Sequence, residues 1–273
     1  MGIQWKKYIF TINEIFGTND SVSGLGKADA HTFYQQQELV EPERKLAVHR
    51  QVVTLLIDVT KTEEALRKDM NRTTRYQINK ASRDELTVEV IDKPTMDDVL
   101  AFEGFFNPFA DEKGIERCRT DRVRGLMESG MLVITYVYDK EGRKLASHLY
   151  ISNGQRAAML YSCSGRFTNA DVPPIVVGRA NRYLHWQDIL YFKHAGYQYY
   201  DFLGLSINEE DKEEQNINKF KKGFGGKEVT EYQSYIPQNG LGKMLVLILK
   251  FRWRNQLEVK KGKEVHRRKR KEG

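Results

Sequence analysis

The segment from Gly178 to Gly226 constrains the fold of this chain most strongly. A helix-patterned stretch from Arg179 to Ala195 ends on Gly196 and leads directly into a predicted strand, 197–203, which contains a single carboxylate, Asp201. A helix that stops at glycine and feeds an apolar strand is a typical αβ step. Sixteen residues separate this strand from the segment Phe220-Lys-Lys-Gly-Phe-Gly-Gly. Its lysines and flexible glycine backbone suit binding of a carbonyl or an anion.

The remaining pattern predicts a mixed sheet of α+β or α/β type, flanked by helices. Antiparallel strands in a row precede the helix–strand step, with a hairpin signal at Asn153-Gly154. The predicted strands are 52–58, 86–91, 131–138, 145–151, 157–163, 197–203 and 229–236, and the predicted helices are 66–81, 95–105, 121–128, 179–195 and 241–257. Accordingly, we expect an N-terminal extension or partial module (1–46), a main domain (47–237) and an amphipathic helix with a polybasic tail (238–273).

Charge and cysteine usage point to a cytoplasmic protein. The net charge is +7, but most of the excess lies after Lys250, so the body is close to neutral and a surface that coats nucleic acid is not indicated. The two cysteines, Cys118 and Cys163, have no metal-ligand spacing. The start of the chain lacks the apolar run of a signal peptide, and no run of 18 apolar residues exists. We expect a cytoplasmic protein, soluble or peripheral at the inner face of the cell membrane.

Three motifs in order resemble the Fem-like branch of the GNAT acyltransferase superfamily. These are the Arg-Tyr-x-Ile-x-Lys-Ala helix at 75–81, Tyr-Asp-Phe-Leu-Gly at 200–204 and Phe-Lys-Lys-Gly-Phe-Gly at 220–225. The resemblance covers residues 50–236 and implies a GNAT-like sheet. It also implies transfer of an acyl or aminoacyl group to an amine of a cell-envelope precursor, such as a sugar, a peptide or a lipid-linked intermediate, with no metal.

The donor implied by the resemblance is acyl-CoA, or alternatively aminoacyl-tRNA. The chain is too short for two complete GNAT modules and has no long charged heptad hairpin like the arm of some family members. Its body is also not strongly basic, as a tRNA-binding surface would be. These departures favour acyl-CoA as co-substrate and make tRNA the less favoured partner.

Acyl transfer to an amine requires a polarised donor carbonyl and a route for protons. The resemblance implies that the carbonyl sits where strands 157–163 and 197–203 part. Lys221 matches the family's Phe-Lys lysine and would support the oxyanion or a donor phosphate, with Phe220 and Phe224 beside it. Lys222 is the expected solvent-facing neighbour. The alternative is that both lysines belong to a surface helix.

Other strand residues carry alternative roles. Asp201 could orient the amine or act as a base with a raised pKa, or it could simply cap the turn after its strand. Tyr161 could protonate the leaving group, although packing is common for a strand tyrosine. His148 is interpreted as a core or surface residue rather than a site residue, and Cys163 as a buried thiol rather than a nucleophile.

A set of basic residues is predicted to bind phosphate groups of the donor or acceptor, because arginine binds phosphate in bidentate fashion. The set comprises Arg75 and Lys80 on the basic helix, Arg166 after strand 157–163, and Arg179 near the start of the long helix. For the helix residues the alternative is a solvated face.

The segment 241–271 joins an apolar run to a polybasic tail. This pattern fits a helix lying on an anionic membrane surface. The alternatives are a closing helix packed on the sheet with a disordered tail, and non-specific RNA binding by the tail. A non-catalytic adaptor at the membrane is the alternative function for the whole chain.

Overall fold

The computed structural model describes residues 1–17, 25–169 and 171–272. The chain divides into two compact units. Unit 1 comprises Met1–Thr54, Gly204–Asn218 and the chain from Glu228 onward, and unit 2 comprises Leu55–Leu203 and Lys219–Lys227. Strands β4 (Val48–Asp58) and β10 (Lys227–Pro237) and helix α6 (Lys212–Lys222) each have residues in both units.

Unit 2 holds a mixed sheet in the order β4-β9-β8-β7-β6-β5. Pairing is antiparallel throughout except between β8 and β9, which run parallel. Its strands are β5 (Thr87–Ile91), β6 (Leu132–Tyr138), β7 (Lys144–Ser152), β8 (Arg156–Ser164) and β9 (Tyr199–Asp201). The predicted strands 86–91, 131–138, 145–151 and 157–163 are thus confirmed, and with them the mixed α/β fold class.

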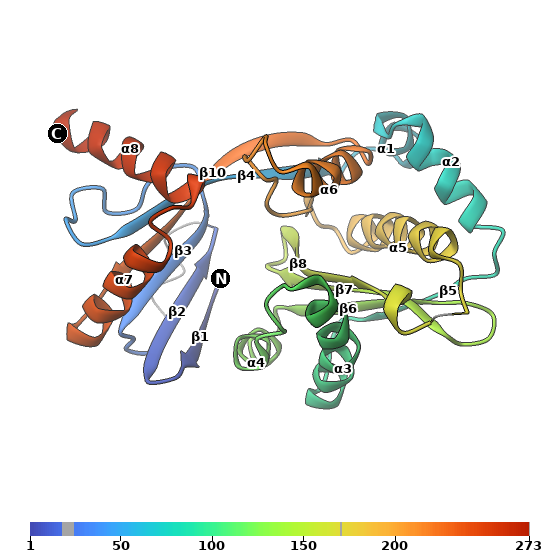
Figure 1. Cartoon of the computed structure of the whole chain (residues 1–273), viewed down its shortest axis with the longest axis horizontal. Coiled ribbons are helices and arrows are strands. Elements are labelled where there is room, and N and C mark those ends of the chain that lie inside the picture. The colour runs from blue at the N-terminus through green and yellow to red at the C-terminus, as the bar shows by residue number, and fades with distance from the viewer. Residues whose placement is uncertain (18–24, 170, 273) are drawn as a thin grey trace. The chain divides into compact units, whose positions relative to one another are not determined.

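Helices cover both faces of this sheet (Figure 1). They are α1 (Glu63–Asp69), α2 (Arg72–Ala81), α3 (Met96–Lys113), α4 (Thr120–Glu128) and α5 (Pro174–His194), with a 3₁₀ turn η2 (Gly165–Phe167). Helix α5 packs on β7 and beside α2, whereas α3 and α4 pack on the other face against β8 and β6. Apolar residues of β6, β7 and α5, such as Val137, Leu145 and Leu184, form the core on the α5 face.

Unit 1 has a sheet in the order β1-β2-β3-β10-β4. The pairs β1–β2 and β3–β10 are antiparallel and β2–β3 is parallel. Its further elements are β1 (Gly2–Lys7), β2 (Phe10–Phe16), β3 (Ala30–Gln36), α7 (Gly240–Arg252) and α8 (Leu257–Glu272). Helix α7 packs on β2 and β3, and its Val246 is buried in a cluster with Val48 and Val259. A second cluster, which includes Ile15, Phe33 and Ile236, forms the other part of the core of this unit.

Several predicted elements end at other residues in the structure. The helix expected over 66–81 is two helices, because the Asn71 side chain accepts the Thr74 N–H (2.7 Å) and starts α2 anew. The first of the two helices is capped by Thr62. The helix capped at Thr95 runs on to Lys113, through Pro108. The helix predicted over 241–257 ends early, at Arg252, as α7. The basic tail that follows forms a separate helix, α8.

Candidate functional site

The two strands predicted to part are β8 and β9. They pair over only three residue pairs, from Arg156–Tyr199 to Ala158–Asp201, after which β9 ends and β8 continues to Ser164. The chain after β9 follows β4 instead, since the Phe202 N–H donates to the Leu55 carbonyl (3.1 Å). On its other side β8 has a register shift, with Leu149 opposite Tyr161 and Tyr150 opposite Met159. Leu160 is therefore an extra residue of a β-bulge, a feature that re-aims backbone groups.

Lys221 lies in the last turn of α6, close to the point where β9 ends. Its Nζ donates to the Leu203 carbonyl oxygen (3.2 Å), immediately after β9. Burial lowers the pKa of this lysine from 10.5 to about 8, and the Asp201 carboxylate acts in the opposite direction. A buried lysine of this kind holds a poorly solvated positive charge, which a negative charge arriving beside it would stabilise.

Asp201 is fully buried at the end of β9 and is held by groups of its own unit. Its Oδ2 accepts hydrogen bonds from the Arg156 guanidinium, with Nε at 2.8 Å, and its Oδ1 accepts the Leu203 N–H (2.8 Å). Both oxygens of this carboxylate are therefore engaged in hydrogen bonds, and those of Oδ2 come from a charged donor. Of the roles considered for Asp201, the hydrogen bond to the Leu203 N–H favours capping of the turn after β9.

Phe220 and Phe224 hold residues 220–224, the lysine segment, against α5. Their ring centroids lie 5.5 Å apart, and the His185 ring lies 5.5 Å from Phe220 and 5.2 Å from Phe224. The Arg182 guanidinium stands over the Phe220 ring at 4.7 Å, where burial lowers its pKa. The motif therefore lies against a helix that supplies one more cation, Arg182, which sequence reasoning did not single out.

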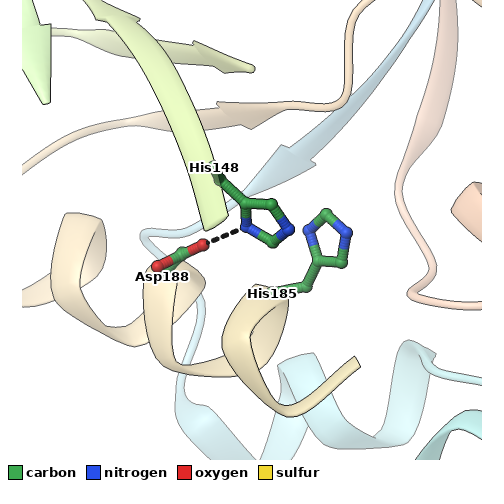
Figure 2. Close-up of side chains that lie close together, drawn as sticks. All are labelled: His148, His185 and Asp188. Atoms are coloured by element: carbon green, nitrogen blue, oxygen red, sulfur yellow. Dashed lines mark hydrogen bonds and ion pairs between the residues drawn. The ribbon is translucent and has the colours of Figure 1, made fainter. Parts of the chain in front are cut away.

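His185 also belongs to a buried network of polar side chains, and Figure 2 shows three of its members, His148, His185 and Asp188. His185 Nδ1 lies 2.7 Å from the Tyr200 hydroxyl, Tyr200 lies 2.9 Å from the Tyr150 hydroxyl, and Tyr150 donates to Asp188 Oδ2 (2.6 Å). Since Tyr150 donates to the carboxylate, it accepts from Tyr200, which in turn accepts from His185. Asp188 also accepts from His148 Nδ1 (2.7 Å). Burial, together with nearby cations, lowers the pKa of His185 well below its usual range, so His185 is neutral.

Ligand atoms of His148, His185 and Asp188 lie within 4.8 Å of one another, close enough to raise the question of a metal ion. The two imidazole rings stack at 4.0 Å with 28° between their planes (Figure 2). Ring nitrogens bind metals in the plane of the ring, so stacked rings do not converge on one ion. His148 Nε2 also lies 2.9 Å from the Asn181 side-chain oxygen. The cluster therefore fits a hydrogen-bonded core better than a metal centre.

Tyr161 lies apart from the lysine segment. Its ring packs on Phe106 of α3 (4.8 Å), and its hydroxyl accepts the Arg119 N–H (3.2 Å). His185, in contrast, belongs to α5, which covers the other face of the sheet (Figure 1), and its ring contacts Phe220. Burial raises the pKa of Tyr161, which makes its hydroxyl a weaker acid, and the structure does not bring it to Lys221.

The predicted phosphate-binding residues lie on several elements of unit 2, and one of them, Arg179, is buried. Arg75 donates to carbonyls at the end of α1, including Met70 (2.6 Å), and Arg179 pairs with Asp84 (3.3 Å). Lys80 is exposed in the last turn of α2, and Arg166 is exposed with its guanidinium 5.8 Å from the Phe167 ring. The structure does not gather these four residues into one site.

The residues that sequence reasoning missed are Arg156, Arg182, His185 and Asp188. One signal was present: His185 and Asp188 are polar residues three apart among the apolar residues of α5, which also buries Leu184, Trp186, Ile189 and Phe192. Polar groups on a buried helix face require partners. The sequence does not say which partners, because these come from β7 and β9.

No family model matches the sequence, and no curated protein matches it. Solved structures do resemble it. A crystal structure of FemX aligns with a TM-score of 0.60 at 14% identity, covering 90% of this chain and 87% of that one. The structure of L-PGS from Bacillus licheniformis gives 0.54 at 12% identity, covering 91% and 84%. The C-terminal domain of a putative lysylphosphatidylglycerol synthetase from Agrobacterium fabrum gives 0.54 at 15%, covering 90% and 83%. The chain therefore shares the mixed α/β fold of FemX and of these synthetase domains.

Proposed function

We propose that the protein is an acyltransferase that moves an acyl group from an activated donor to an amine by direct attack. The observation that carries this proposal is the parting of β8 from β9 beside a lysine whose pKa is about 8. Likeness of fold to FemX and to lysylphosphatidylglycerol synthetase domains supports it.

In the proposed reaction the amine nitrogen attacks the donor carbonyl and forms a tetrahedral oxyanion. Backbone N–H groups of β8 past Ala158 would donate to that oxyanion, and the Lys221 ammonium would stabilise its charge. The C–S or C–O bond to the leaving group then breaks, the nitrogen loses its proton, and the leaving thiolate or alkoxide takes one up. Asp201 and Arg156 would keep the Leu203 turn, and with it Lys221, in place.

We favour acyl-CoA as the donor and an amine on a cell-envelope or surface-glycan precursor as the acceptor. The near-neutral body of the chain supports a small donor over tRNA. The alternative is aminoacyl transfer from aminoacyl-tRNA, which the fold likeness to FemX and the synthetase domains supports equally well. A cytoplasmic location, where such donors are made, follows from either version.

The test is transfer of label from each donor class to a panel of soluble amine acceptors, with Lys221→Ala beside Lys222→Ala. Lys222 is the adjacent residue and is exposed, so it controls for loss of a positive charge in this segment. Loss of one oxyanion-stabilising group costs roughly 100- to 1,000-fold in kcat. We expect that loss for Lys221→Ala and less than about threefold for Lys222→Ala.

Two results would contradict the proposal. Equal rates for the two variants would remove Lys221 from the chemistry. No transfer from either donor class, with no thermal stabilisation by CoA or by a non-hydrolysable aminoacyl-tRNA analogue, would favour the adaptor function.

A further inference from the structure

Helix α7 in unit 1 has two apolar faces, only one of which is covered. Leu245 and Val246 are buried on the face that packs against the sheet. The opposite face exposes five large apolar side chains, which are Leu241 (44%), Met244 (42%), Leu247 (54%), Ile248 (49%) and Phe251 (69%). Residues 241, 244, 248 and 251 recur at helical spacing, so they form one continuous stripe.

The orientation of this stripe is fixed by a close backbone contact. A Cβ at Gly242 would lie 1.7 Å from the Asp29 carbonyl oxygen, so α7 approaches the sheet more closely than a side chain permits. The Asn239 side chain, which accepts the Gly242 N–H (2.9 Å), donates to Asp29 (2.7 Å). The helix therefore cannot roll to bury its second apolar face without losing these contacts.

Cations border the exposed stripe. Lys243 and Lys250 lie along one side of it and Arg252 along the other, by helical position, and all three are exposed. The Arg254 guanidinium stacks on the Phe251 ring at 4.0 Å, which joins a charge to the most exposed apolar residue. Residues 240–257 contain no Asp or Glu, and residues 240–273 carry twelve Lys and Arg against three Glu.

We propose that this face of α7 docks on an anionic lipid bilayer, with the stripe at the level of the acyl chains and the cations at the headgroups. An apolar stripe bordered by Lys and Arg is the pattern of a helix lying in the membrane interface. A second copy of the chain is a poorer occupant, because pairing two such faces would bring cation against cation. At 13 residues, α7 is also shorter than the roughly 20 residues that cross a bilayer. In the described part of the chain, no helix is long and apolar enough to do so.

Vesicle co-sedimentation tests the proposal on the full chain. The probes are vesicles of phosphatidylcholine alone and vesicles containing phosphatidylglycerol, each at low and high salt. Leu247→Ser with Phe251→Ser removes apolar groups from the stripe, and Lys243→Gln, Lys250→Gln and Arg252→Gln together remove the border charges. Ile175→Ser is the matched control, since Ile175 is an equally exposed apolar residue (66%) in α5 of unit 2.

The wild type should bind phosphatidylglycerol vesicles, and salt should weaken that binding. The apolar variant should lose at least about tenfold in affinity, and the charge variant roughly 100-fold on the anionic vesicles. Ile175→Ser should bind like the wild type. Circular dichroism confirms that each variant folds.

Three results would overturn the proposal. They are no binding by the wild type, equal binding by the stripe variant and wild type, and a concentration-dependent dimer that the stripe variant abolishes in light scattering. Transfer to a soluble amine needs no vesicle, so failure here and failure of the transfer reaction are separate results.

Discussion

Replacing Lys221 by methionine should stabilise the protein while abolishing transfer. The two side chains are similar in length, so the change removes the charge and leaves most of the packing. In the folded protein the lysine has a pKa of about 8 against its ordinary 10.5, because burial disfavours its charged form. That difference corresponds to about 3 kcal/mol of free energy lost on folding when the lysine is protonated. Loss of the hydrogen bond to Leu203 costs about 1 kcal/mol of stability, so the free energy of unfolding should rise by a net amount of about 2 kcal/mol at pH 7.

The sign of the pH dependence follows from proton binding. Between pH 8 and 10.5 the unfolded chain holds a proton on Lys221 that the folded chain has released. The stability contributed by this group therefore rises with pH through that range, and the penalty is complete below about pH 8. The difference in free energy of unfolding between Lys221→Met and wild type should shrink as the pH rises from 8 to 10.5.

Urea denaturation at a series of pH values measures this difference, with Lys222→Met as the exposed control. The control should leave the free energy of unfolding within about 0.5 kcal/mol of wild type at every pH. Two results would refute the inference that Lys221 is a poorly solvated cation. They are a Lys221→Met variant less stable than wild type at pH 7, and stability profiles of variant and wild type that run parallel from pH 8 to 10.5.

Three further predictions concern the core. Asp188→Asn alters the carboxylate that accepts two buried hydrogen bonds and should lower the free energy of unfolding, measured by urea denaturation, by about 2–4 kcal/mol. A decrease of less than about 1 kcal/mol would contradict the buried network. Gly242→Ala should destabilise by about 1–3 kcal/mol, because its Cβ would meet the Asp29 carbonyl, and unchanged stability would exclude that close contact. Cys118 and Cys163 are buried, which raises the pKa of Cys118 to about 12 and that of Cys163 further. Both should react with a thiol reagent at pH 8 only after unfolding, and rapid labelling of the native protein would be the opposite result.

The sequence predicted those features that depend on nearby residues. Alternation and turn signals located the strands of the unit 2 meander, and the helix predicted from Thr95 starts there, with Thr95 as the N-cap of α3. The Phe-Lys-x-x-Phe motif placed two rings around a lysine, and the structure has them in contact through His185. In each case the interacting residues are close in the chain, so local periodicity and capping are sufficient.

The sequence failed where the decisive partner lies far along the chain. Asp201 meets Arg156 across 45 positions, and His148 meets Asp188 across 40, so no local pattern reveals either pair. Local rules also misled at Pro108, which was expected to lie beyond the helix. A proline removes one helical hydrogen bond, and tertiary packing of α3 on β8 overrides that cost.

Leu203 adopts a positive φ of 50°, which is uncommon for a residue other than glycine, asparagine or aspartate. Its N–H donates to Asp201 and its carbonyl accepts from Lys221, so the backbone of one residue connects the carboxylate to the lysine. Rotation of this residue into an extended conformation would break both connections together. Leucine and isoleucine are near-equal in volume but not in backbone preference, since branching at Cβ makes a positive φ more costly. Leu203→Ile would therefore break the backbone connection between Asp201 and Lys221. Leu203→Asn should keep that connection, although asparagine differs more from leucine in polarity, because it tolerates a positive φ.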